Sequence, residues 1–110
     1  MREIPLKYRK ELEADPFMKK CIWTDETTDI SWEHCWIYAG KQIVEPWATV
    51  PLARRLNTSS MPTHIKDYCK LISLGRAKMS EVVKNYPKFN WVKEKERLTR
   101  KLYESKKQDN

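Results

Sequence analysis

The pattern of hydrophobic and polar positions changes along the chain. In the first thirty residues it predicts helices and then a short extended segment. Apolar residues recur among charged ones over residues 5–20, and Asp15 and Pro16 interrupt this pattern. Because proline is favoured in the first turn of a helix, Pro16 could begin a second, short helix. The next segment, 21–24, is β-prone, and the polar run 25–29 predicts a hairpin loop.

The middle of the chain is rich in β-branched and aromatic residues and predicts two strands. The strongest strand pattern runs from Ile30 to Tyr38. Gly40, which can take a positive φ, ends it. A second apolar stretch covers residues 43–50, and Pro46 interrupts it, so we expect an edge strand or an irregular return there.

The pattern after residue 50 predicts helices. Pro51 has the position of a first-turn proline, so residues 52–57 would begin a short helix. Thr63 could cap a helix from His64 to about Leu74, closed by Gly75. Two more helices are expected: a short one from Ser80 to Tyr86, and a last one capped by Asn90, in which Trp91, Leu98 and Leu102 recur at helical spacing.

The order of helices, two strands and helices predicts a small α+β fold. With 110 residues the chain is long enough for one hydrophobic core, so we expect a single domain over residues 1–105 and a polar, frayed tail over residues 106–110. No apolar run is long enough to span a bilayer and no signal-peptide pattern is visible. We therefore expect a cytoplasmic protein.

The charge of the chain favours an anionic partner. Lys and Arg number 22 against 15 Asp and Glu, which gives a net charge of +7. Nucleic acid is the usual partner of such a domain, because each neutralised phosphate releases counterions. The alternative is that a lysine-rich helical surface serves only solubility.

Glycine and cysteine usage excludes several kinds of site. Only two glycines occur, so there is no glycine-rich phosphate cradle. The cysteines contain no C-x-x-C pair, which excludes the common thiolate zinc knuckle and a disulfide scaffold. We expect Cys21, Cys35 and Cys69 to be buried, reduced thiols.

The most informative stretch is Trp32-Glu33-His34-Cys35-Trp36-Ile37-Tyr38-Ala39-Gly40-Lys41-Gln42, followed by Trp47-Ala48-Thr49-Val50-Pro51-Leu52-Ala53-Arg54-Arg55-Leu56-Asn57. A carboxylate beside a histidine, a β-return and a Val-Pro-Leu helix start resemble the HNH nuclease motif, the ββα-metal finger. The resemblance is strongest to small HNH nucleases found among replication and recombination genes of bacteriophages and prophages. It covers roughly residues 21–57, the expected finger, and we expect the helical part of the same domain to follow over residues 63–105.

The resemblance implies a DNA endonuclease that hydrolyses phosphodiester bonds with a single Mg²⁺ or Mn²⁺ ion. Residue by residue, His34 matches the general base, and Glu33 and Asn57 match the metal ligands. An imidazole with a pKa near neutral suits removal of a proton from water, and oxygen ligands suit a hard cation. The residues that would contact DNA phosphates are Lys41, Gln42, Arg54 and Arg55.

Three departures from the motif stand out. Ala48 has the position of the asparagine that usually orients the base histidine, and a methyl group cannot do this. Ala53 and Leu56 replace a zinc-knuckle cysteine and a histidine, so no structural zinc is expected. Strand alternation also places Glu33 and His34 on opposite faces, unless they lie at a strand end or a bulge.

Simpler interpretations stay open for each site residue. His34 could be a packed core histidine, Glu33 a solvated surface residue, and Asn57 a helix C-cap or turn residue. His64 would lie in the first turn of a helix and bind nothing. Two functional alternatives follow: a nucleic-acid-binding module without catalysis, and a protein-interaction module anchored by exposed tryptophans.

Overall fold

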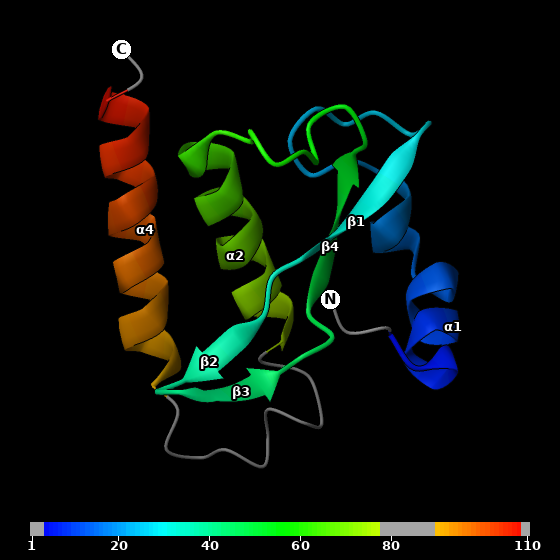
Figure 1. Cartoon of the computed structure of the whole chain (residues 1–110), viewed down its shortest axis with the longest axis horizontal. Coiled ribbons are helices and arrows are strands. Elements are labelled where there is room, and N and C mark those ends of the chain that lie inside the picture. Colours follow the sequence, from blue (N-terminus) through cyan, green and yellow to red (C-terminus); the bar gives the residue numbers. More distant parts are fainter. Residues whose placement is uncertain (1–3, 78–89, 109–110) are drawn as a thin grey trace.

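The computed structural model describes residues 4–77 and 90–108, which form an α+β domain with two small antiparallel sheets (Figure 1). The short helix predicted over residues 80–86 lies outside the described residues. In chain order the elements are α1 (Leu6–Ala14), the 3-10 helix η1 (Pro16–Lys19), β1 (Ile30–His34), β2 (Ile37–Ala39), β3 (Gln42–Glu45), β4 (Thr49–Ala53), α2 (Thr63–Ala77) and α4 (Trp91–Gln108).

The elements stack in layers around the β1–β4 pair. β4 contacts α2 on one side and η1 on the other, and α4 packs along the far side of α2 (Figure 1). Each layer buries an apolar face against the next, which is the usual way a small α+β domain forms its core. The layers therefore place the strands between the N-terminal helices and α2.

The strands form one long, interrupted hairpin. β1 pairs antiparallel with β4, from Ile30 opposite Ala53 to His34 opposite Thr49. β2 pairs with β3, with an irregularity between Ile37 and Tyr38. The single strand predicted over residues 30–38 is thus two strands with a break between them. Gly40 has the expected positive φ of 65° in the turn that joins β2 to β3.

The helix predicted from Pro51 is wrong, because Pro51 lies inside β4. Pro51 is opposite Trp32, and its carbonyl accepts a hydrogen bond from the Ile22 N–H at 3.1 Å. This edge of β4 faces away from β1, so the missing N–H of proline costs no hydrogen bond within the strand pair. Residues 54–57 then form a turn, and the helix that follows the hairpin begins only at Thr63.

The segment 21–24 is also not a strand. It forms a turn in which the Cys21 N–H donates to the Glu26 carbonyl at 2.8 Å. Asp25 and Asp29 adopt positive φ values of 66° and 52°. Short polar side chains tolerate this conformation better than β-branched ones. The polar run 25–29 is therefore a loop, as predicted, but it does not join two strands of a hairpin.

The N-terminal helices follow the prediction closely. α1 ends at Ala14, and Asp15 caps η1 by accepting a hydrogen bond from the Phe17 N–H at 3.0 Å. Pro16 is the first residue of η1, where its missing N–H has no partner to lose. Asp15 also forms an ion pair with Arg76 of α2, which connects the two sides of the domain.

The two long helices lie antiparallel and extend beyond their predicted ends. α2 continues through Gly75 to Ala77, so Gly75 is not its C-cap. Asn90 caps α4 as predicted, by accepting from the Lys93 N–H at 3.0 Å. α4 continues to Gln108, although a frayed tail was expected from residue 106. Apolar contacts between α2 and α4 make this pair the most extensive packing in the described chain.

Two buried clusters form the core. One lies between the β1–β4 pair and α2 and contains all three cysteines, which are free and buried as predicted. The other joins β2 and β3 to α2 and α4. Val50 and Leu52 of β4 are fully buried in the first cluster. Among the described residues, no helix is both long enough and apolar enough to cross a membrane.

Candidate functional site

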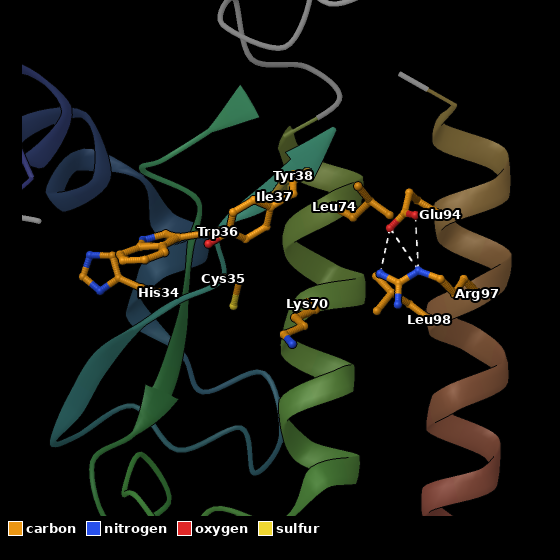
Figure 2. Close-up of a pocket in the computed structure, with 10 residues that line it drawn as sticks. All are labelled: His34, Cys35, Trp36, Ile37, Tyr38, Lys70, Leu74, Glu94, Arg97 and Leu98. Atoms are coloured by element: carbon orange, nitrogen blue, oxygen red, sulfur yellow. Dashed lines mark hydrogen bonds and ion pairs between the residues drawn. The ribbon is translucent and has the colours of Figure 1, made fainter. Parts of the chain in front are cut away.

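His34 is the last residue of β1, and its imidazole lies on the side of the strand away from α2 and α4 (Figure 2). Its Nε2 atom is buried and, in the described part of the chain, has no hydrogen-bond partner. Burial lowers the pKa of His34, because a charged imidazolium is poorly solvated there. The side chain of Ala48 packs in the core, and its carbonyl accepts from the Cys35 N–H at 2.8 Å. His34 thus resembles a packed histidine more than an oriented general base.

Glu33 faces the opposite side of β1, toward α2. Burial raises the pKa of its carboxyl group, and the positive charges of Lys66 and Lys70 on α2 partly offset this shift. The carboxylate of Glu33 and the imidazole of His34 therefore lie on different faces of the sheet, as strand alternation predicts. The simpler interpretation, in which Glu33 is a solvated residue on the outer face, is wrong, because Glu33 is half-buried.

Asn57 lies in the turn after β4 and stabilises the opposite end of the strand pair. Its Nδ2 donates to the Ser31 hydroxyl at 2.9 Å, and that hydroxyl donates to the Leu52 carbonyl at 3.0 Å. Ser31 precedes His34 by three residues, which in a strand is about 10 Å. Asn57 is thus a turn residue, one of the two alternatives that the sequence left open.

These three residues do not form a metal site. The imidazole of His34 points away from α2 (Figure 2), Glu33 lies beside Lys66 and Lys70 of α2, and Asn57 donates a hydrogen bond to Ser31 near the other end of β1. Two lysines beside Glu33 would repel a divalent cation. Across residues 4–77 and 90–108, no group of three or more His, Cys, Asp or Glu side chains is placed to hold a metal ion. The Mg²⁺ or Mn²⁺ that the HNH resemblance implies therefore does not fit this arrangement.

The four predicted phosphate contacts divide into two groups at opposite ends of the hairpin (Figure 1). Arg54 forms an ion pair with Asp29 at 2.9 Å, and Arg55 forms one with Glu26. Lys41 and Gln42 are exposed in the turn between β2 and β3. These residues do not form one patch, and acidic partners neutralise both arginines.

A groove between the strands and the two long helices is the most promising site, and the motif did not point to it. It has a volume of about 320 Å³. Figure 2 shows its residues: His34, Cys35, Trp36, Ile37 and Tyr38 from the strands, Lys70 and Leu74 from α2, and Glu94, Arg97 and Leu98 from α4. Apolar residues form part of its lining, and polar and charged groups the rest.

Cations from both helices line the helical side of this groove. Lys70 lies on α2, and Arg97 lies on α4, where it makes an ion pair with Glu94 at 2.8 Å. Side chains four residues apart share a helix face, so Lys66 and Lys101 extend the two cationic rows by one turn each. All four cations are exposed. We call this site, which Tyr38 also lines, the cationic groove.

Tyr38 provides an accessible aromatic ring on the strand side of the groove. Its exposed fraction is 45%, which is high for a large aromatic residue in a strand. Trp36 also lines the groove and is half-buried, with its indole beside the His34 imidazole and away from the two helices (Figure 2). Aromatic rings beside cations can hold the bases and the phosphates of one strand at the same time.

The tryptophans offer less to a protein partner than their number suggests. Trp23 has an exposed fraction of 36%, and the other four are half-buried. The Trp23 ring packs against His64 and Tyr68 of α2, with centroid distances of 5.6 and 5.3 Å. His64 lies in the first turn of α2, as predicted.

Comparison with protein-family models, curated proteins and solved structures gives no match to this chain. Function must therefore be inferred from the site itself. The sequence contained one usable signal for the cationic groove, the i, i+4 spacing of Lys66 with Lys70 and of Arg97 with Lys101. Nothing in the sequence indicated that the two rows would lie beside the same groove.

Proposed function

We propose that this protein binds nucleic acid in the cationic groove and does not hydrolyse it. The observation that carries the proposal is that Lys70 and Arg97 line the same groove as Tyr38, an exposed aromatic residue. The net charge of +7 supports the same class of partner. This is the non-catalytic alternative that the sequence left open.

The chemistry of the groove suits a single-stranded segment. Lysine and arginine side chains neutralise phosphates without reading sequence. An aromatic ring stacks on the face of a base, and this face is accessible only where the base is not stacked in a duplex. Glu94 lies beside Arg97 and Glu33 beside Lys66 and Lys70, so we assign phosphate binding to the cations of both helices together.

The hypothesis of hydrolysis rests on the HNH resemblance and receives less support from the geometry. A general base must reach the water that a metal ion holds. His34 is instead on the other face of β1 from Glu33, and its Nε2 is buried. Endonuclease activity is therefore the alternative function against which nucleic-acid binding is tested.

The experiment measures binding and cleavage on the same protein. Fluorescence anisotropy with a labelled single-stranded oligonucleotide and its duplex, from about 50 to 200 mM salt, should give affinity for the single strand that falls steeply with salt. Addition of EDTA should leave this affinity unchanged. Plasmid incubated with the protein and Mg²⁺ or Mn²⁺ should stay intact.

Two results would contradict the proposal. Absence of binding to either oligonucleotide at the lowest salt would remove the nucleic-acid function altogether. Metal-dependent nicking that His34→Ala abolishes would instead support the endonuclease. A His34→Ala variant that nicks as well as the parent would point to a contaminating nuclease.

A further inference from the structure

The outer face of α4 carries apolar side chains that the fold leaves exposed. Val92 and Tyr103 have exposed fractions of 64% and 69%. The opposite face of the helix packs on α2 through Leu98 and Ser105. In Figure 1, α4 forms one edge of the domain, with α2 on its inner side. Val92 and Tyr103 line a cavity together with Leu74 and Gly75 of α2, so a partner on this face would also meet that part of α2.

The intervals between the residues on this face are the same when they are counted from either end of the helix. Residues 92, 96, 99 and 103 are separated by four, three and four positions, which places them in one stripe. An antiparallel second copy of α4 would therefore bring Val92 of one chain against Tyr103 of the other, and Glu96 near Thr99. A two-fold axis requires this kind of self-complementary arrangement.

The charged residues beside the stripe are arranged so that positions related by the same two-fold axis carry opposite charges. Lys93, Glu96, Arg100 and Glu104 are exposed and follow one flank of the stripe. In an antiparallel pair the same flank of each helix meets, so Glu96 of one chain approaches Arg100 of the other. Lys93 and Glu104 match in the same way. In a parallel pair opposite flanks of the two helices meet, so Glu96 would not approach Arg100 and both charge pairs would be lost.

We propose that the outer face of α4 binds a second copy of this chain, with the two α4 helices antiparallel. The stripe from Val92 to Tyr103 is about 17 Å long. An interface of this length is smaller than that of a stable dimer, so association should be weak and dependent on concentration. Arg97 shares a helix face with Lys93, four residues before it, so the dimer would place this cation of each groove beside the interface, whereas Lys70 lies on α2.

Sedimentation velocity from about 1 to 500 µM protein tests the proposal. The parent should shift from monomer to dimer as concentration rises. Glu96→Arg should weaken association about tenfold, because it places two like-charged pairs across the axis. The double variant Glu96→Arg/Arg100→Glu should restore association, since it exchanges the two signs. Glu11→Arg on exposed α1 changes the net charge equally and should have no effect.

Cross-linking tests the orientation. A mixture of the Val92→Cys and Tyr103→Cys variants should form a disulfide between the two kinds of chain under mild oxidation, whereas Val92→Cys alone should not. A parent that is monomeric at every concentration would overturn the proposal and leave the face to a different partner. A double variant no better than Glu96→Arg would overturn the antiparallel pairing, as would efficient cross-linking of Val92→Cys to itself.

Discussion

The Nε2 atom of His34 is buried at the end of β1 and has no hydrogen-bond partner among residues 4–77 and 90–108. Thr49, directly opposite on β4, and the neighbouring Trp36 also have buried polar atoms without partners in the described chain. A buried polar group without a partner costs about 1 to 3 kcal/mol. The placement of His34 therefore carries an energetic cost, as does the burial of the Glu33 carboxylate.

Replacement of His34 by phenylalanine should stabilise the fold by about 1 kcal/mol at neutral pH, because it removes the unsatisfied nitrogen and keeps an aromatic ring in the strand. Chemical denaturation at pH 7.5 measures this change. The Glu33→Gln variant is a useful comparison on the other face of β1. A large loss of stability in His34→Phe would show that Nε2 has a partner that stabilises the native state.

The pH dependence of stability provides a separate test of the same residue. Since the pKa of His34 is lowered by burial, the unfolded chain binds a proton more readily than the folded chain. Stability should fall as pH drops below about 6.5 toward the lower pKa of the folded state. The raised pKa of Glu33 acts in the opposite direction. Its contribution to the free energy of unfolding is present at low pH and is lost as pH rises through the pKa of Glu33 in the folded state.

The His34→Phe variant separates the two effects. Denaturation of parent and variant from about pH 7.5 to pH 5 should show a smaller loss of stability in the variant over this range. Equal losses in the two proteins would contradict the assignment of the lowered pKa to His34. Glu33 is present in both proteins, so its contribution cancels in the difference.

For single residues, the sequence predicted burial and strand face better than it predicted contacts between residues far apart in the chain. Strand alternation correctly separated Glu33 from His34, and turn chemistry allowed for the role of Asn57. The burial of the three cysteines was also predicted. The acceptor of the Asn57 amide, Ser31, could not be predicted, because it depends on how β1 pairs with β4.

At the scale of elements, β4 is the segment that the sequence misassigned. Pro51 is typical of a helix start, and Val50-Pro51-Leu52 also matches the HNH pattern. Tertiary context decided otherwise, because Val50 and Leu52 fill the core between the sheet and α2. Local propensity could not show that the edge beside Pro51 would accept a hydrogen bond from Ile22 and need no donor in return.

If β4 forms the core, shortening one of its buried side chains should lower the free energy of unfolding strongly. Leu52→Ala should lower the free energy of unfolding by about 2 to 5 kcal/mol, since Leu52 is fully buried. Leu6→Ala, on the exposed side of α1, should change it by less than about 0.5 kcal/mol. Urea denaturation of both variants checks this contrast. Similar small effects at the two positions would contradict the placement of residues 49–53 in the core.

At the scale of the whole molecule, the sequence predicted the α+β class and a basic surface, but it did not predict where the cations gather. The motif pointed to Arg54 and Arg55, which form ion pairs with Asp29 and Glu26, respectively, at one end of the hairpin. The cations of the groove come instead from two helices, α2 and α4, and residues 78–90 lie between these helices in the sequence. Only the antiparallel packing of α2 and α4 places them beside Tyr38.

Oligonucleotide binding by charge-matched variants tests most directly whether the cationic groove holds the nucleic acid. Lys66→Ala/Lys70→Ala removes two cations from the groove, and Lys7→Ala/Lys10→Ala removes two exposed cations from α1, on the other side of the sheet. The groove variant should lose tenfold or more in affinity, and its slope of log affinity against log salt should fall by about 2. The α1 variant should bind like the parent. Equal losses in the two variants would contradict the account, since binding would then follow net charge and not the groove.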